Sequence, residues 1–435
     1  MTGKNIIGKI KEAALDALIP EIECWLEDGK VKAKAHGARG ILFQPLLDYS
    51  MGRLNKNKVI GKSNGANVYT LYNPPMPSSA GLRLLEGRLK EKFAGLVTPT
   101  TVTFALTYTC PCNCEFCSAD RFFRDKNKSR KFLSTEEAKS AIEQSVDLGC
   151  TNITFTGGEP MSRKDFFELV AHVPKDKAIA ICFTSGFFLN DENIARLKEA
   201  GIFAVNVSID SIVPETHNAF RRTKGLFEKA WGGAEKLRDA GILVGISTHA
   251  SHENIADGTL ELLLKKAKDA GFNEVTIFDS MPTGKWIKHE EVILTPEERK
   301  KVVELAQRYV AMEGHMGVIA QSWINSPHGS GCFAGFFQFY LSAFGDVHPC
   351  DFHPIIFGNI KEKPLKDLWN AIINHPEYKT RKWNCRMQSP AFRQRYIECI
   401  PEDAELPVRV DYFGLYDKAA PDVPADSRNA VASPT

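Results

Sequence analysis

Cysteine is the residue type whose spacing points most directly to chemistry in this chain of 435 residues. Eleven cysteines are present, and thiolates are soft ligands that hold iron–sulfur clusters or zinc. Two groups stand out: Cys110, Cys112, Cys114 and Cys117 in one short stretch, and Cys332, Cys350, Cys385 and Cys399 in the C-terminal third. We expect the isolated Cys24, Cys150 and Cys182 to be inert, buried thiols.

The first cysteine group allows two ligand sets. A zinc site would use all four thiolates, but zinc ligands usually have two to four residues between them. Only one residue separates Cys110 from Cys112 and Cys112 from Cys114. The alternative takes Cys110, Cys114 and Cys117 and omits Cys112. Three thiolates bind three irons of a cubane and leave the fourth iron open to another ligand. We favour this second set.

The cysteine loop follows the first of six apolar, β-branched runs that alternate with helical stretches. These runs are 101–108, 152–155, 178–184, 205–209, 243–248 and 274–278. Capping boxes at Ser134 and Thr295 start the first and last helices, and several helices end before a glycine. Six strand–helix units predict a parallel α/β sheet, either an open sheet or a partial barrel. Ligands then bind at the carboxyl ends of the strands.

The loops after these strands resemble those of the radical S-adenosylmethionine (SAM) superfamily. The matching segments are Cys110–Cys117 with Phe116 before the last cysteine, Thr156-Gly157-Gly158-Glu159-Pro160, Thr184-Ser185-Gly186, Ser208-Ile209-Asp210-Ser211, His217–Arg221 and Met281-Pro282-Thr283-Gly284. The resemblance covers about residues 98–318. It implies a partial (β/α)6 barrel whose cluster lies on Cys110, Cys114 and Cys117. It also implies that SAM is bound by Phe116, Gly157, Gly158, Glu159, Ser185, Ser208, Asp210 and Arg221, with Arg222 as a rival for the last role.

The segment from Gly331 to Asn370 resembles the auxiliary iron–sulfur extension called the SPASM or twitch domain. It contains a predicted hairpin turn at Gly345-Asp346 and a short helix from Leu365. Only four cysteines lie in this part of the chain, so at most one auxiliary [4Fe–4S] cluster fits, on Cys332, Cys350, Cys385 and Cys399. A structural zinc site is the alternative. We expect His348 and His353 to be polar loop residues.

The resemblance implies an enzyme that reductively cleaves SAM to a 5′-deoxyadenosyl radical and abstracts hydrogen from a substrate. The auxiliary cluster then handles electrons in a net oxidation or bond-forming step, and a flavodoxin or ferredoxin supplies the reductant. A small-molecule substrate is slightly favoured, and a ribosomal-peptide maturase is the alternative. A non-enzymatic iron–sulfur electron carrier is the contrasting class. Asp210, Asp279 and His249 lie near strand ends, but none can be named as general acid or base.

The remaining sequence bounds the class of protein. Charged residues make up 25% and the net charge is +2, which gives no electrostatic basis for binding nucleic acid. No apolar run is long enough to span a bilayer and the N-terminus lacks a signal-peptide pattern, so we expect a cytoplasmic location. We expect four regions: a mostly helical extension (1–97), the barrel (98–318), the auxiliary domain (319–418) and a disordered tail (419–435). Within the extension, 6–18 and 82–93 have helical patterns.

Overall fold

A ten-stranded sheet organises the molecule, with strand order β11-β10-β9-β8-β7-β6-β5-β12-β13-β15. The computed structural model describes residues 19–120, 129–401, 404 and 406–415. Seven strands run parallel in chain order: β5 (Thr101–Thr107), β6 (Asn152–Gly157), β7 (Ile179–Thr184), β8 (Ala204–Ser208), β9 (Leu243–Ala250), β10 (Glu274–Asp279) and β11 (Gly317–Ala320). The six predicted strands are all present, and the sheet does not close into a full barrel. The short β11 was not predicted.

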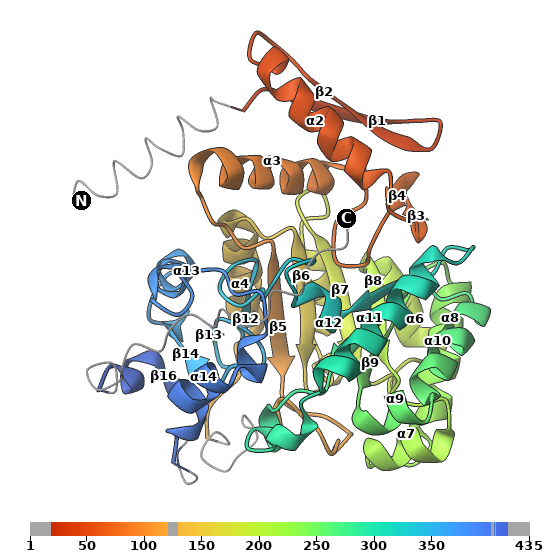
Figure 1. Cartoon of the computed structure of the whole chain (residues 1–435), viewed down its shortest axis with the longest axis vertical. Helices are drawn as coiled ribbons and strands as arrows, with labels where there is room; N and C mark the ends of the chain where they lie inside the picture. Colours follow the sequence, from red (N-terminus) through yellow and green to blue (C-terminus); the bar gives the residue numbers. More distant parts are fainter. Residues whose placement is uncertain (1–18, 121–128, 402–403, 405, 416–435) are drawn as a thin grey trace.

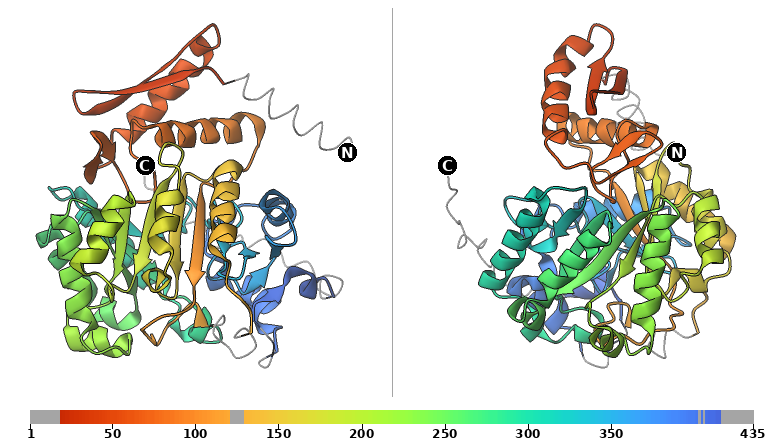
Figure 2. Two further views of the ribbon diagram at one scale, coloured as in Figure 1. Left: turned by 180° about the vertical axis from the view of Figure 1, so that it is seen from behind. Right: turned by 90° about the vertical axis from the view of Figure 1, so that its right-hand side faces the viewer.

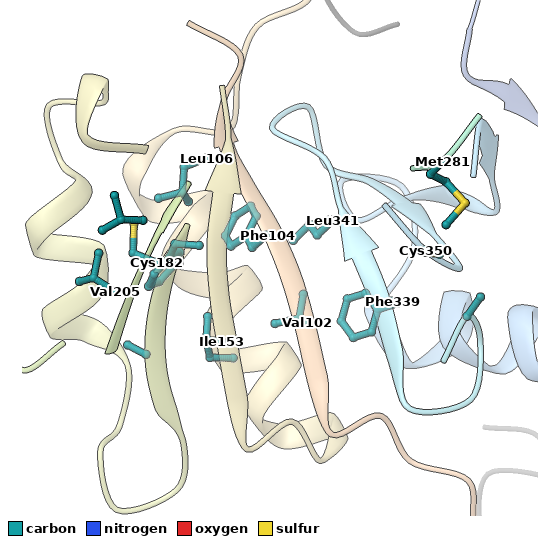
Figure 3. Close-up of a cluster of buried hydrophobic side chains, with 14 of the residues drawn as sticks. Val102, Phe104, Leu106, Ile153, Cys182, Val205, Met281, Phe339, Leu341 and Cys350 are labelled. Carbon is teal, nitrogen blue, oxygen red and sulfur yellow. The ribbon is translucent and has the colours of Figure 1, made fainter. Parts of the chain in front are cut away.

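Helices connect successive parallel strands. They are α4 (Thr135–Leu148), α5 (Phe166–His172), α6 (Asp191–Glu199), α7 (Pro214–Phe220), α8 (Leu226–Asp239), α9 (His252–Ala256), α10 (Thr259–Asp269) and α11 (Pro296–Ala311), with α12 (Gln321–Ile324) after β11. The predicted capping boxes at Ser134 and Thr295 are both formed. Alternate side chains of the strands, such as Val102, Phe104 and Leu106, belong to the main buried core (Figure 3). Since successive side chains of a strand point to opposite faces, the side chains between them face the inside of the curved sheet.

The C-terminal domain extends the same sheet beyond β5. Strand β12 (Gln338–Leu341) pairs parallel with β5, and β13 (Asp346–His348) and β15 (Gly358–Asn359) continue antiparallel. The predicted turn at Gly345-Asp346 joins β12 to β13, and the predicted helix is α13 (Leu365–Asn374). A second pair, β14 (Ile355–Ile356) and β16 (Val408–Arg409), precedes and follows α14 (Pro390–Arg393) and the π-helical turn η7 (Gln394–Glu398). Figure 3 shows Leu341 of β12 beside Phe104 of β5, and Phe339 beside Val102, as the strand register requires.

The N-terminal unit lies across the amino ends of the strands (Figures 1 and 2). It contains a hairpin of β1 (Ile22–Glu27) and β2 (Lys30–Ala35), helix α2 (Gly40–Leu54), a second hairpin of β3 (Gly61–Ser63) and β4 (Ala66–Val68), and helix α3 (Ser79–Ala94). Helix α3 was predicted, but the hairpins were not. The predicted helical pattern at 6–18 and the predicted tail at 419–435 lie outside the described residues. No helix in the described parts is long and apolar enough to cross a membrane.

Residues 60–72 of this unit close the amino end of the curved sheet. The side-chain Nδ2 of Asn273 donates to the Ile60 carbonyl at 2.8 Å, and the Leu71 N–H donates to Glu274 Oε1 at 3.3 Å. The Tyr72 hydroxyl lies 2.8 Å from that of Thr276 on β10. The inside of the sheet is therefore covered at its amino end by residues 60–72.

Glu274 gives this closure a pH dependence. Burial raises the pKa of Glu274 to about 8, from an ordinary value of 4.5. Folded Glu274 therefore keeps its proton to a higher pH than unfolded Glu274, and stability is lost as pH rises from 4.5 to about 8. We predict that the free energy of unfolding of the wild type falls by on the order of a few kcal/mol across this pH window, and that Glu274→Gln removes this fall.

The measurement is the thermal midpoint of the metal-free protein as a function of pH. Glu304→Gln, at an exposed position of α11, is the matched control and should leave the profile unchanged. A Glu274→Gln variant that loses stability with pH as steeply as the wild type would contradict the assignment.

Candidate active site

The first cysteine group lies in the loop that leaves the carboxyl end of β5. Cys110, Cys112, Cys114 and Cys117 are all half-buried. The thiols of Cys110 and Cys114 both donate hydrogen bonds to the sulfur of Cys112, which lowers the pKa of Cys112 and raises the pKa values of the two donors. Burial raises the pKa of Cys117. The sulfurs of Cys110, Cys112 and Cys114 thus lie close together, and Cys117 interacts electrostatically with Cys114. The group includes Cys112, which the ligand set inferred from the sequence omits.

Two glycines after β6 hold the cysteine loop from one side. A Cβ atom on Gly157 would lie 2.1 Å from the Thr107 carbonyl oxygen, and one on Gly158 would lie 2.5 Å from that of Thr109. Both distances are far below van der Waals contact, so only glycine fits. The Gly158 N–H donates to the Thr107 carbonyl at 2.7 Å, and the Glu159 N–H to that of Thr109 at 2.9 Å. The two glycines thus let the backbone after β6 approach Thr107 and Thr109, just before Cys110.

The loop after β10 holds the cysteines from another side. A Cβ on Gly284 would lie 2.0 Å from the Cys117 carbonyl oxygen, and Gly284 has a positive φ of 56°. The Lys285 N–H donates to the same carbonyl at 3.1 Å. The ammonium of Lys285 donates to the Cys114 carbonyl at 2.8 Å and to the Asn113 side chain at 2.6 Å. The cysteine loop is therefore fixed by contacts with two other strand ends.

Glu159 is fully buried and satisfied by the loop after β7. Its carboxylate accepts from the Thr184 hydroxyl at 2.8 Å, from the Ser185 hydroxyl at 2.6 Å and from the Ser185 N–H at 2.8 Å. Burial raises the pKa of Glu159, and these hydrogen bonds oppose the rise. The predicted residues Glu159 and Ser185 thus lie together, and their direct bonds position two adjacent loops.

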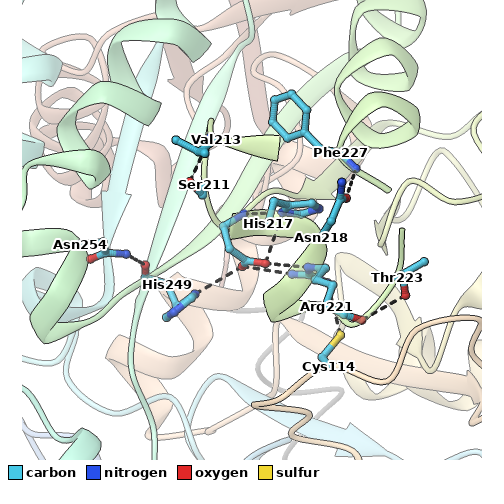
Figure 4. A network of polar contacts seen from close by, with 11 residues as sticks. Cys114, Ser211, Val213, His217, Asn218, Arg221, Thr223, Phe227, His249 and Asn254 are labelled. Carbon is cyan, nitrogen blue, oxygen red and sulfur yellow. Dashed lines mark hydrogen bonds and ion pairs between the residues drawn. The ribbon is translucent and has the colours of Figure 1, made fainter. Parts of the chain in front are cut away.

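A second network joins the ends of β8 and β9 (Figure 4). Arg221 donates to Asp210 from Nε at 2.7 Å and from Nη2 at 3.2 Å, while its Nη1 lies 4.0 Å from the Cys114 sulfur. His249 Nδ1 lies 3.3 Å from Asp210. Although burial opposes ionisation, Arg221 and His249 hold the pKa of Asp210 far below its usual range. Arg221, predicted to pair with the SAM carboxylate, is bonded to Asp210 in the structure.

Aromatic rings surround Phe116 beside this network. The Phe116 ring stacks on Phe220 at 4.6 Å between centroids and on His249 at 5.2 Å, and Trp286 lies 5.9 Å away. The Arg221 guanidinium lies 5.3 Å from the Phe116 ring. Such flat apolar faces suit a planar purine ring. Ser208 ends β8 with a partly exposed side chain.

Three of the four C-terminal cysteines form a second group. Cys332, Cys350 and Cys385 are buried. Burial raises the pKa values of Cys350 and Cys385, and an electrostatic interaction with the neighbouring Cys332 adds to both rises. The Arg386 guanidinium is also buried and donates to Cys332. Gln338 of β12 donates to the Cys350 sulfur at 3.7 Å. The Cys385 sulfur lies 3.7 Å from the sulfur of Met281, which follows β10.

Cys399 is separate from this group in the described contacts. It follows η7, is only partly buried, and donates to the Arg395 carbonyl at 3.0 Å. The charges that act on Cys399 come from Lys288 and Glu398, not from another cysteine. The structure therefore favours Cys332, Cys350 and Cys385 as ligands, and Cys399 stays a prediction.

The donor sets fit iron–sulfur chemistry. Within the described ranges, no three His, Cys, Asp or Glu side chains converge on a single ion. The structure instead contains two groups of thiols. Each group has a guanidinium beside it, Arg221 in the first and Arg386 in the second, which offsets the negative charge of thiolate ligands. Soft thiolate ligands of this kind select iron–sulfur clusters.

Several residues at the site were not predicted from the sequence. Lys285, Phe220 and Trp286 contact the cysteine loop or Phe116. The only sequence signal for them was proximity to a strand end or to a matching motif. Arg386 follows Cys385 directly, but nothing in the sequence indicates that it donates to Cys332.

Comparison with known proteins agrees with this geometry. A family described as the radical SAM superfamily matches residues 104–264, and a second family, described as an iron–sulfur cluster-binding domain of the SPASM type, matches residues 332–398. The chain belongs to the radical SAM superfamily. As a radical SAM enzyme with a SPASM domain, it uses a [4Fe–4S] cluster, SAM and an auxiliary iron–sulfur centre.

Relatives of this radical SAM enzyme include proteins named as heme synthases and proteins named as peptide cyclases. An AdoMet-dependent heme synthase of Methanosarcina barkeri is 28% identical over 70% of this chain and 95% of its own length. A PqqA peptide cyclase of Gluconobacter oxydans is 25% identical over 62% of this chain and 76% of its own length. The crystal structure of Streptococcus suis SuiB bound to S-adenosylmethionine shares the fold, with a TM-score of 0.54 and 14% identity over 68% of this chain and 70% of that chain.

The close approach of Gly158 to Thr109 leads to a prediction about the first cluster. Gly158→Ala must displace the backbone just before Cys110. Because displacement of reacting groups by about 1 Å can cost a hundredfold in rate, we expect 5′-deoxyadenosine formation to fall by about that factor. Iron content and 5′-deoxyadenosine are measured after anaerobic reconstitution.

Gly232→Ala in α8 is the matched control, because a Cβ there meets open space. It should keep full activity and gain roughly 0.5–1 kcal/mol of stability from the better helix propensity. Equal activity of the two variants would contradict the steric argument.

The isolation of Cys399 leads to a prediction about the auxiliary cluster. We expect Cys385→Ala to lose about four of about eight irons per chain, since it removes a ligand of one cubane. Cys399→Ala should keep nearly all of its iron. Loss of about four irons in Cys399→Ala would instead show that Cys399 completes the ligand set.

Proposed function

We propose that this radical SAM enzyme oxidises, or forms a bond at, an uncharged carbon centre of a small molecule. Its first cluster lies on Cys110, Cys114 and Cys117, and its auxiliary cluster on Cys332, Cys350 and Cys385. When bound, the first cluster supplies the electron that cleaves SAM to methionine and a 5′-deoxyadenosyl radical, which takes a hydrogen atom from the substrate. An auxiliary cluster held by the C-terminal cysteines would supply the acceptor for the electron left on the substrate, so that loss of a proton would complete a net oxidation.

The inner surface beside the cysteine loop carries this proposal. On the carboxyl halves of the strands, partly exposed side chains alternate with side chains of the main core and therefore face inward. They are Thr156, Phe183, Ser208, Ser247, His249 and Phe278. Among them only His249 can carry a charge. Such a surface suits a neutral group, because burying a charge without a partner is costly.

Three features of the chain suit the inner surface beside the cysteine loop for this reaction. Phe116, Phe220 and Trp286 offer flat faces for the adenine of SAM. Arg221 places a positive charge beside Cys114, and Asp210 holds the guanidinium in place. Residues 60–72 exclude water from the amino end. The heme synthase relative, whose name gives a small-molecule product, supports the proposed substrate class. A ferredoxin or flavodoxin is the proposed reductant.

Peptide modification is the second candidate, and one feature of the N-terminal unit favours it. A hollow of about 510 Å³ lies between β2 and α2, lined among others by Trp25, Lys30, Lys32 and Lys56. An exposed aromatic ring and several ammonium groups suit an acidic peptide. The PqqA peptide cyclase relative supports the same alternative.

The test of the proposed function is SAM cleavage under anaerobic conditions with dithionite. We expect 5′-deoxyadenosine from the wild type, none from Cys114→Ser, and a near-normal amount from Cys112→Ser, because Cys112 is outside the proposed ligand set. Protein that holds about eight irons but forms no 5′-deoxyadenosine would be an electron carrier.

The same assay separates the two substrate classes. The low-molecular-mass fraction and the peptide fraction of an extract from the source cells are added separately. Stimulation of 5′-deoxyadenosine formation by the low-mass fraction supports the first candidate. Stimulation by the peptide fraction alone overturns it in favour of the second.

A further inference from the structure

The segment Met281–Lys285, which we call the coupling loop, contacts both cysteine groups. It leaves the end of β10 and leads into the 3-10 turn η4 (Gly284–Trp286). None of its five residues is a proposed ligand of either cluster. Its contacts, however, reach the backbone of the first cysteine loop and the side chains of the auxiliary group.

The C-terminal half of the coupling loop contacts the first cysteine loop. Gly284 lies so close to the Cys117 carbonyl that a Cβ would be 2.0 Å from it. Lys285 donates to the Cys117 carbonyl from its N–H at 3.1 Å and to the Cys114 carbonyl from its ammonium at 2.8 Å. A shift of this half must therefore move the residues that carry two of the three proposed ligands.

The N-terminal half contacts the auxiliary group. The Cys385 sulfur lies 3.7 Å from the Met281 sulfur, and both side chains are buried. The Thr283 hydroxyl donates to the Phe352 carbonyl at 3.0 Å, two residues after Cys350. Two separate segments of the auxiliary site thus meet the coupling loop within three of its residues.

The two halves are joined by a short, constrained turn. The Thr283 N–H donates to the Met281 carbonyl at 2.8 Å, and the Trp286 N–H to that of Thr283 at 2.9 Å. Pro282 between them has a fixed φ angle. Three peptide units separate the Cα atoms of Met281 and Gly284, so these atoms lie at most about 11 Å apart. Such a turn has little freedom to absorb a movement at one end.

We propose that the coupling loop is a positioning element that links the two clusters, so that SAM binding at the first alters the auxiliary cluster and the reverse. The inference rests on the proposed ligand assignments, since it requires a cluster at each cysteine group. The coupling passes through Thr283 and Met281 on one side and Gly284 and Lys285 on the other. Because coupling between two sites is reciprocal, each site must report changes at the other.

Thr283→Val tests this link, because it removes the hydroxyl on the auxiliary side and leaves the contacts of Gly284 and Lys285 with the first loop. Protein is reconstituted without oxygen, and the Kd for SAM is read from the electron paramagnetic resonance of the reduced first cluster. We expect SAM binding to weaken by at least about fivefold. In the wild type, SAM should also shift the midpoint potential of the auxiliary cluster, and Thr283→Val should lose that shift.

Two variants complete the design. Thr283→Ser keeps the hydroxyl and should restore both readouts. Ser322→Ala removes a buried hydrogen bond to Asp279 at 2.6 Å, at the same end of β10 but outside the loop, and should change the Kd by less than about twofold.

Two results would overturn the inference. One is a Thr283→Val Kd within about twofold of the wild type when both clusters are loaded. The other is a wild-type auxiliary potential that SAM leaves unchanged. A wild type with no response to SAM at the first cluster would instead overturn the proposed function.

Discussion

Backbone-to-backbone contact at the first cysteine loop is the constraint on which the rest of this structure depends. Gly157, Gly158 and Gly284 come from the ends of β6 and β10, and each lies where a Cβ would collide with a carbonyl of the segment 107–117. Hydrogen bonds at these contacts contribute about 1 kcal/mol each, but the steric requirement is what fixes the loop. A cysteine loop held in this way has little freedom to change its backbone conformation.

Two buried carboxylates among the described residues around the site have close hydrogen-bond partners. Asp210 pairs with Arg221, and Glu159 is bonded to the loop of Thr184 and Ser185. The inner surface between them is made of hydroxyls and rings. This separation matches the needs of radical chemistry, in which a neutral carbon centre must be held close to a charged cofactor without water.

The fold was largely predictable from the sequence, because its signals are local. Strand periodicity, capping boxes such as that of Ser134, and glycines after helices each depend on a few neighbouring residues. Contacts between distant segments were not predictable. Gly158 was placed at the correct loop, but its partner, Thr109, follows from how two strands pack. The separation of Cys399 from Cys385 likewise depends on the path of η7, which has no sequence signal. The β1–β2 hairpin, by contrast, has a local alternating pattern and was nevertheless not predicted.

The pairing of β12 with β5 makes the two metal-bearing modules parts of one sheet. A linker between two modules can be cut without exposing hydrogen-bonding groups. Separating two paired strands, in contrast, exposes the backbone groups of both. Excision of the C-terminal module would leave one side of β5 without its ladder, and an unpaired edge invites association with other chains. Chimeras of this enzyme should therefore be joined within helices or surface loops, with β12 carried along with the barrel it completes.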